Sequence, residues 1–390
     1  MMEYKFSFAN KYKILFLIMM IIGVASGTLA LINHGSTSYF WSFVLLNNYY
    51  FLAISLAGVF FIVVHVLGEA GWHTSIQRVP EAMGTFIPYA GILMLIMLIF
   101  GGHSLYEWIQ NEHADPLIDD KKWYLNVPFF SARFVVYFAG WILLSYLMRK
   151  MSLMQDMDPD LRYYRRYRIF SGIFIVFFAI TVSASSWDWL MSIDAHWFST
   201  MYGWYIFSGL LVSGVAVIIL IVLALKSAGY MQHLNKEHLH DLGKYLFAFS
   251  ILWTYLWFSQ YLLIWYGNLP EETVYFAGRL HNFKILFFLN LVMNFVAPFL
   301  ILMTRNSKRT QWILAIAALM VFAGHWLDYY MAIMPGIMGK PTGFGFFEAG
   351  LTVGYLGFFL FITFRSLSKA SLVPFNHPFF KESLEYHTNY

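Results

Sequence analysis

Ten predominantly apolar stretches recur along the 390-residue chain and limit what it can fold into. A helix needs about 20 such residues to cross the hydrocarbon core of a bilayer, where each backbone polar group must be satisfied within the segment. The stretches lie at about 12–32, 49–68, 82–102, 129–148, 168–187, 200–225, 244–266, 282–303, 311–332 and 344–364. We therefore predict an all-α integral membrane protein with about ten transmembrane helices.

The composition fits a chain that faces lipid. Hydrophobic residues make up 59% of the sequence and charged residues 12%, against roughly 25% charged residues in soluble domains. The chain has no cysteine, which excludes disulfides, cysteine-bound iron–sulfur clusters, thiolate zinc sites and covalently attached c-type haem. We expect no metal and no covalently bound cofactor in this chain. The net charge of +4 gives no indication of nucleic acid, and we expect no such partner.

The distribution of lysine and arginine predicts the orientation in the membrane. When the tails and the loops after even-numbered stretches are assigned to one side, 19 of the 25 basic residues fall there. The other six are Lys121, Lys122, Arg133, Arg279, Lys284 and Lys340. We therefore expect both termini in the cytoplasm. The first stretch resembles a signal peptide, but its length and the nine stretches that follow favour a retained helix.

Two parts of the chain resemble each other at an offset of about 140 to 160 residues. An aromatic segment that contains an aspartate ends one helix at 187–193 and another at 326–333. This pattern predicts two parallel four-helix bundles, formed by spans 2–5 and 6–9 and flanked by spans 1 and 10, unless aromatic helix ends recur by chance. The predicted parts are the N-terminus with the first span (1–45), the first bundle (46–190), the second bundle (191–335), the tenth span (336–366) and a cytoplasmic tail (367–390).

One set of ionisable residues is predicted in the cytoplasmic half of the membrane. His65, Glu69 and His73 follow one another at intervals of four residues, which would place them on one face of a helix. Arg78 follows in a short loop, and Lys244 begins the seventh stretch. Charged residues at membrane depth are costly, so this stripe is a candidate proton path. The alternative is that Glu69 and His73 lie at the level of the lipid headgroups, whereas His65 lies deeper.

A second set, the outer polar cluster, is predicted at the opposite surface. Its acids, histidines and cations come from several helices: Asp188, Asp194, His196, Arg133, Arg279, His281, Lys284, His325, Asp328 and Glu348. A quinol headgroup needs carboxylates or histidines as proton acceptors and an aromatic wall around its ring. The alternative is an interfacial aromatic belt with ordinary helix caps. Bound haem b would need histidines on facing helices, for which His281 and His325 are the candidates.

These features resemble a known family, the F subunits of bacterial alternative complex III. The resemblance rests on the ten spans, the paired bundles and the segment from Ser186 to Gly203, which reads SWDWLMSIDAHWFSTMYG. Those subunits belong to the polysulfide-reductase membrane-subunit (NrfD-like) family. Asp188, Asp194 and His196 lie in the matching segment, whereas the other candidate residues rest on the depth argument alone.

The resemblance implies a place in a respiratory quinol:cytochrome c oxidoreductase complex in a bacterial inner membrane. Its expected ligand is a quinol such as menaquinol, with haem and iron–sulfur clusters confined to partner subunits. The expected partners are an iron–sulfur protein, multihaem cytochromes c, a homologous quinol-binding membrane subunit, a terminal oxidase and lipids.

In such a complex the chain would contribute a quinol-type pocket or proton half-channels. Two other functions remain open at this stage. The first is a purely structural membrane anchor of the complex. A secondary transporter would need broken helices at mid-membrane, for which Asn290, Asn294 and Pro298 are the candidates.

Overall fold

The computed structural model describes residues 5–34, 37–110, 115–341 and 345–387. Within these ranges the chain contains no β-strand, and ten helices are long and apolar enough to cross a membrane. The predicted fold class, an all-α protein with about ten transmembrane helices, is therefore confirmed. The start of the tenth predicted span, at residue 344, lies outside the described residues, and the helix there is described from Phe346.

The first group of four helices corresponds to spans 2–5. It consists of α2 (Ser38–Leu67), α4 (Ile87–Leu105), α7 (Val127–Met157) and α8 (Leu161–Trp189). Helix α2 packs against α4 and α8, α7 packs along α8, and α7 also contacts α4, which closes the group. Short helical turns precede α4: 3₁₀ turns at Gly71–Ser75 and Gly84–Phe86 and helix α3 (Arg78–Met83) between them.

The second group corresponds to spans 6–9. It consists of α9 (Met201–Ser227), α10 (Lys236–Gly267), α12 (Lys284–Leu291) with α13 (Ala297–Leu302), and α15 (Gln311–Met338). Helix α9 packs against both α10 and α15. It also packs against α2, and these two helices join the groups. Their central role explains why 83% of the apolar window of α2 and 89% of that of α9 are buried.

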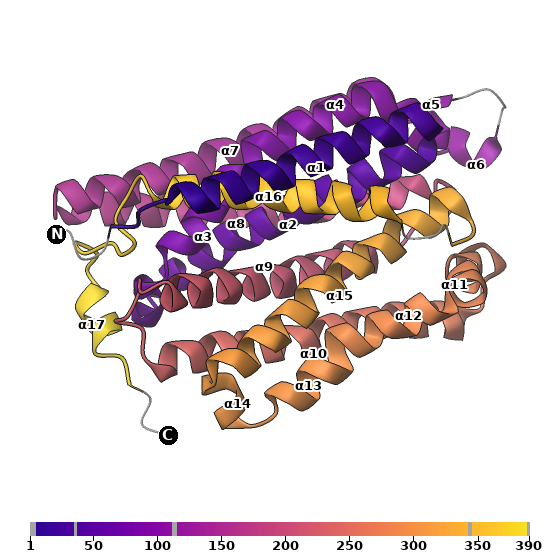
Figure 1. Cartoon of the computed structure of the whole chain (residues 1–390). Coiled ribbons are helices and arrows are strands. Elements are labelled where there is room, and N and C mark those ends of the chain that lie inside the picture. The colour runs from indigo at the N-terminus through magenta and orange to yellow at the C-terminus, as the bar shows by residue number, and fades with distance from the viewer. Residues whose placement is uncertain (1–4, 35–36, 111–114, 342–344, 388–390) are drawn as a thin grey trace.

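Helices α1 (Asn10–His34) and α16 (Phe346–Leu367) form a pair that lies along the first group (Figure 1). Their backbones approach closely at Gly23 and Gly354. A Cβ atom added at Gly354 would lie 2.4 Å from the Cα of Gly23. The absence of side chains at these two positions therefore permits the contact.

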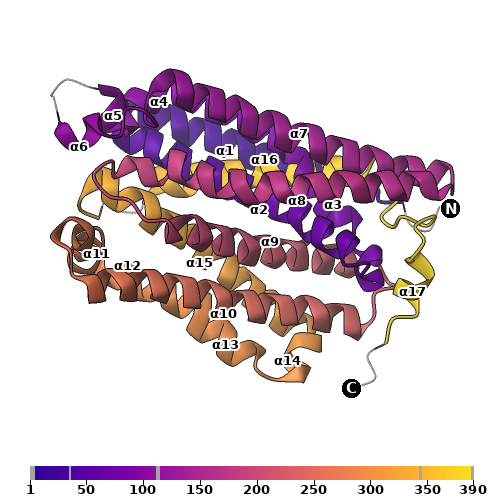
Figure 2. The ribbon, with the colours of Figure 1, turned by 180° about the vertical axis from the view of Figure 1, so that it is seen from behind.

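The helices run roughly alongside one another and give the molecule two ends (Figures 1 and 2). The end that carries both termini, here the terminus end, includes α14 (Arg305–Arg309) and α17 (Phe380–Leu384). The opposite end, here the loop end, includes α5 (Glu107–Gln110), α6 (Pro116–Asp119) and α11 (Pro270–Asn282).

The helices differ from the predicted apolar stretches mainly in length. Helix α7 continues to Met157 and α10 begins at Lys236, in each case through residues too polar for the apolar count. Span 8 stays helical from Lys284 to Leu302, but it contains a π-helical turn at Val292–Val296. Such turns insert one extra residue into a helix and often occur at functional positions.

Candidate functional site

The predicted outer polar cluster does not converge on one site. The structure separates its members into two buried clusters, one in each four-helix group, and into contacts at the surface of the loop end. Asp188 and Arg133 belong to the first group, and His325 and Asp328 to the second. The remaining members lie in or beside the connecting segments of the loop end.

Asp188 is fully buried and paired with Arg133. The guanidinium of Arg133, on α7, donates through Nε and Nη2 to the two carboxylate oxygens of Asp188 at 2.9 and 2.8 Å. Tyr137 donates a further hydrogen bond at 2.9 Å. Arg133 also lies 3.9 Å from the ring centroid of Tyr124, a cation–π distance. The charge of Asp188 is thus neutralised by a permanent cation.

Asp328 is buried in the second group among neutral donors. The Tyr205 hydroxyl donates to Oδ1 at 2.5 Å, the Trp253 indole to Oδ2 at 2.9 Å and the Asn290 amide to Oδ1 at 2.7 Å. Asn294, within the π-helical turn, donates to the Asn290 side chain at 2.6 Å. These donors come from α9, α10 and span 8, so Asp328 is the point at which the group's helices meet.

Asp194 and Arg279 meet at the loop end. Arg279, on α11, is 5% exposed and donates to the backbone carbonyls of Met331, Ala332 and Tyr275. Its Nη2 lies 3.4 Å from Oδ2 of Asp194, and its guanidinium stacks 3.3 Å from the Tyr275 ring centroid. Burial raises the pKa of Tyr275 to about 12 despite the nearby Arg279 cation. This contact fixes α11 against the end of α15.

Two other members of the predicted cluster have structural partners. His196 is exposed and lies 2.6 Å from Asp115, and this contact lowers the pKa of the Asp115 carboxyl. Glu348 is buried and accepts a hydrogen bond of 2.6 Å from the Gly345 backbone, so it caps the start of α16. Glu348 therefore acts as an ordinary helix cap, and His196 forms a surface contact with an acid.

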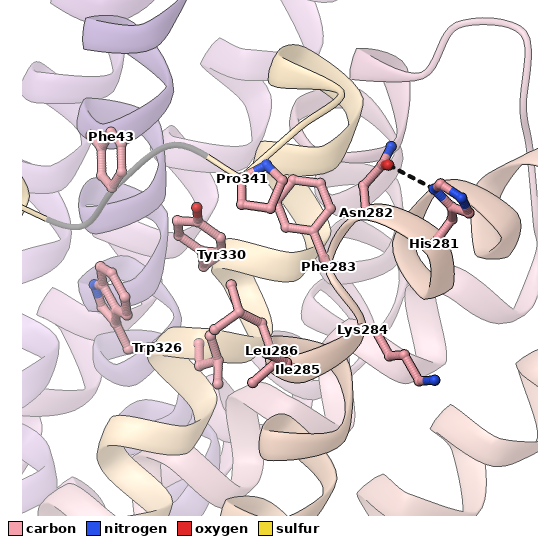
Figure 3. Close-up of a pocket in the computed structure, with 11 residues that line it drawn as sticks. Phe43, His281, Asn282, Phe283, Lys284, Ile285, Leu286, Trp326, Tyr330 and Pro341 are labelled. Carbon is pink, nitrogen blue, oxygen red and sulfur yellow. Dashed lines mark hydrogen bonds between the residues drawn. The ribbon is translucent and has the colours of Figure 1, made fainter.

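His281 and Lys284 lie at a cavity of about 790 Å³ at the loop end (Figure 3). Its walls are mainly aromatic and aliphatic side chains from α2, α12, α15 and the segment between α11 and α12: Phe43, Phe283, Ile285, Leu286, Trp326, Leu327 and Tyr330. His281 is exposed and lies 3.0 Å from the Asn282 side chain, whereas the Lys284 side chain points away from the aromatic residues. The cavity thus combines an apolar wall with a polar rim.

The predicted inner stripe does not lie on one helix, because α2 ends at Leu67. The chain reverses at Glu69, which has a positive φ of 51°, and enters the 3₁₀ turn that contains His73. His73 folds back beside His65, with 5.0 Å between the ring centroids. Glu69 instead points to the surface, where its side chain is half exposed and paired with Arg168. The equal spacing of these residues is therefore not helical spacing.

Buried histidines cluster near the terminus end. The Nδ1 atoms of His65 and His73 contact backbone carbonyls at 2.6 and 2.5 Å, and the Nε2 atoms have no hydrogen-bond partner. The ring of His377, from the C-terminal segment, lies 6.4 Å from that of His73. Burial lowers the pKa of His377 to about 4 and holds that of His73 well below its ordinary value. We refer to His65, His73 and His377 as the histidine cluster.

The C-terminal segment covers the histidine cluster. Ser383, on α17, donates to the Trp72 carbonyl at 2.7 Å and accepts from the Ser75 backbone at 3.1 Å. Tyr386 donates to Asp241 at 2.5 Å, and burial raises the pKa of the Tyr386 hydroxyl. The segment that the sequence suggested was a plain tail is therefore packed against the helical groups.

Arg78 and Lys244 occupy different environments. Arg78 is fully buried and ion-paired with Glu81 at 2.7 Å and with Asp156, and it donates to the Ser152 hydroxyl at 2.9 Å. Lys244 is half exposed and pairs with Asp241. Arg78 thus joins α3 to α7, and its charge also acts on the imidazole of His377.

Helix α10 connects the two polar regions. Tyr245 contacts the His65 ring at 5.3 Å between centroids, and Trp253 contacts the His325 ring at the same distance. Eight residues of helix separate them, or about 12 Å along the axis. Phe249 lies between them and packs against Tyr245. The histidine cluster and the Asp328 cluster are therefore two polar regions separated by an apolar layer.

Sequence reasoning missed the partners of the buried residues. Tyr205 and Trp253 carried no signal beyond their aromatic character, because their role depends on which helix faces Asp328. His377 lies between the buried Leu372 and Val373 and the aromatic Phe379. That apolar composition is the signal that could have indicated a packed C-terminal segment.

Comparisons with known proteins add no family. No family model matches the sequence, and a search of curated proteins finds no relative. Among the described residues, no three or more histidines and carboxylates are arranged to hold a metal ion. His281 lies at the exposed rim of the cavity and His325 inside the second group, so the described structure does not place them face to face.

Proposed function

We propose that the chain is a membrane subunit of a bacterial respiratory quinol-oxidising complex, which binds a quinol at the loop-end cavity and contributes two proton half-channels. Oxidation of a quinol releases two electrons and two protons. The electrons would pass to iron–sulfur and haem centres in partner subunits, which agrees with a chain that has no cysteine for such centres. The protons would leave through titratable side chains and water at the loop end.

The loop-end cavity is the observation that carries this proposal. Its volume of about 790 Å³ falls within the range of about 300–1,000 Å³ typical of ligand pockets. Phe43, Trp326 and Tyr330 offer flat surfaces to a quinol ring. The polar rim at His281 offers a proton acceptor for a headgroup hydroxyl. The apolar wall suits the isoprenoid chain of the ligand.

The separation of the buried polar regions supports the half-channel part of the proposal. The histidine cluster lies toward the terminus end, and the Asp328 cluster lies on the loop-end side of Phe249 along α10. An uninterrupted polar path would leak protons, whereas two regions with an apolar layer between them permit controlled transfer.

The alternative functions make different demands on the same residues. A transporter would need an unwound segment, yet span 8 remains helical through its π-helical turn. A structural anchor would need neither a cavity nor buried histidine ring nitrogens without hydrogen-bond partners. The continuous helix of span 8 and the loop-end cavity therefore favour the respiratory function. The structural anchor remains the second candidate.

Partnership can be tested by mild purification of the tagged chain from its native membrane. We expect c-type cytochromes and an iron–sulfur protein to co-purify. An isolated chain without redox partners, from cells that express them, would contradict the proposal.

Quinol binding can be tested by filling the cavity. Leu286→Trp would place an indole in it, and Leu93→Trp would fill a second cavity of about 360 Å³ that α1 and α16 line. Both leucines are half-buried, so the variants are matched. We expect Leu286→Trp to weaken the binding of a menaquinol analogue to the chain in nanodiscs by at least about tenfold, or about 1.4 kcal/mol. Equal binding by the two variants would place the ligand elsewhere.

A further inference from the structure

The last helix of each four-helix group, α8 or α15, contains one buried aspartate. The two carboxylates differ in the positive charge that faces them. Asp188, at the end of α8, has the bidentate contact with Arg133. Asp328, on α15, accepts hydrogen bonds from Tyr205, Trp253 and Asn290. None of these three donors carries a charge. The second group therefore lacks the permanent cation of the first.

Among the described residues, Asp328 has one ion-pair partner, the imidazole of His325, which is a cation when protonated. Its Nδ1 lies 3.7 Å from Oδ2 of Asp328, one helical turn along α15. The histidine is 0% exposed, and both of its ring nitrogens lack a hydrogen-bond partner. Buried ring nitrogens without partners are unusual in folded proteins and call for a functional explanation.

The other charged and titratable groups near the pair do not supply a countercharge. Tyr205 and Tyr329 are neutral hydroxyls on α9 and α15, and Tyr275 is held neutral by burial. Arg279, the nearest cation on α11, is bound to Asp194 and to backbone carbonyls. Its guanidinium is thus already satisfied at the loop end.

We propose that His325 and Asp328 together hold one exchangeable proton, which provides the positive charge that Arg133 provides permanently in the first group. A buried carboxylate without a countercharge is strongly disfavoured, so it either binds the proton itself or pairs with a protonated imidazole. In both cases the pair carries one proton. Loss of this proton leaves the pair with a net negative charge.

A small cavity gives this proton a route to the loop end. The cavity has a volume of about 20 Å³, and Tyr205, Asn290 and Arg279 are among the residues that line it. This volume exceeds the roughly 10–15 Å³ needed for one water molecule. Tyr205 and Asn290 also donate hydrogen bonds to Asp328, so a water in the cavity would be one side chain away from the carboxylate. The proton therefore exchanges toward the loop end.

The inference deepens the proposed function and rests on it for the source of the proton, the quinol. The presence of the proton can nevertheless be measured without turnover. Infrared difference spectra between pH values, recorded on the full chain in nanodiscs, report carboxyl and imidazole protonation directly. We expect the spectrum of the unmodified chain to contain a deuterium-sensitive carboxyl or imidazole signal. That signal should be lost in Asp328→Asn. In His325→Gln the proton should instead lie on the carboxyl of Asp328, because the buried carboxylate then has no imidazole with which to pair.

The matched control is Asp188→Asn, which changes the corresponding carboxylate of the first group and should leave that signal unchanged. A spectrum that Asp328→Asn leaves unchanged, or that shows no protonated carboxyl in His325→Gln, would overturn the proposal. If either single variant fails to fold, the double variant removes both charges and should fold, because it leaves no unpaired buried ion. Loss of the signal in a chain that purifies without redox partners would uphold the proton pair and contradict only the respiratory function.

Discussion

At the scale of single residues, the described part of the chain shows three ways of keeping an ionisable group inside an apolar protein. Asp188 is paired with a permanent cation, and Asp328 lies beside the buried His325 and accepts hydrogen bonds from neutral groups. His377 avoids charge altogether, since burial lowers its pKa to about 4. Each arrangement predicts a different response to mutation or to pH.

Removal of the permanent cation should destabilise the protein strongly. Arg133→Gln leaves the fully buried Asp188 carboxylate without a countercharge, which typically costs about 3–5 kcal/mol. The matched control is Arg162→Gln, in an ion pair whose partners are both about half exposed, and it should have almost no effect. Thermal unfolding in detergent, followed by circular dichroism, measures both variants. Equal unfolding temperatures for the two would contradict the prediction.

Acidification should weaken the packing of the C-terminal segment. His377 has a pKa of about 4 in the folded chain, below the ordinary value of about 6.5, so the unfolded segment binds a proton first as pH falls. The segment therefore loses stability between about pH 6.5 and pH 4, by about 3 kcal/mol in total. We expect proteolysis within residues 371–387 to accelerate over this range.

The control for this prediction is the exposed His387. His377→Gln should reduce the acid sensitivity, and His387→Gln should leave it unchanged. Some sensitivity should remain in His377→Gln, because the pKa of His73 is also lowered by burial. The same acid response in both variants would show that His377 does not control the segment.

The sequence identified the buried acids at this scale but not their partners. Asp188 and Asp328 stand out because carboxylates are rare in apolar helices. Their different countercharges could not be predicted, since Arg133 and His325 are assigned to them only by the packing of the helices. Glu348 was predicted to belong to the outer polar cluster, and its hydrogen bond with the Gly345 backbone, which caps α16, could not be predicted.

At the scale of elements, the positions of the helices were predictable and their ends were not. An apolar run indicates where a helix crosses lipid, but α2 stops at Leu67 because the chain turns at Gly68 and Glu69. The equal spacing of His65, Glu69 and His73 gave no indication of that turn. The contact between the histidines therefore arises from a reversal of the chain.

The pair formed by α1 and α16 should depend on a glycine contact. Gly354→Ala would place a methyl group 2.4 Å from the Cα of Gly23, so the helices must separate and lose packing. Gly172→Ala in α8 is the matched control, because a Cβ there meets nothing within 4 Å and alanine favours the helix. We expect the first variant to lower the unfolding temperature and the second to leave it unchanged or raise it. Equal destabilisation by the two would refute the role of the contact.

At the scale of the whole molecule, the number of spans is consistent with the position of the termini. An even number of crossings requires both termini to lie on the same side of the membrane. The ten candidate spans found in the described residues return the chain to the side of the first span's start, and both termini lie at the terminus end (Figure 1). The basic residues predict that this side is the cytoplasm. The loop-end cavity and the small cavity beside Tyr205 would then face the periplasm.

Cysteine labelling can test this orientation without background, because the chain has no cysteine of its own. Lys381→Cys lies at the terminus end, and Trp123→Cys lies in the loop end at a side chain that is 77% exposed. A membrane-impermeant maleimide applied to intact spheroplasts should label Trp123→Cys only. Permeabilisation should then expose Lys381→Cys. The reverse pattern would invert the predicted orientation.

The covering of the histidine cluster also has a consequence for biosynthesis. Residues 371–387 leave the ribosome after all ten spanning helices, yet Ser383 and Tyr386 complete the contacts around Trp72 and Asp241. Until these residues are synthesised, the region around His65 and His73 therefore lacks the contacts that Ser383 and Tyr386 provide. The order of translation thus delays the closure of this region until the helices are in place, and truncation within the segment would leave it permanently hydrated.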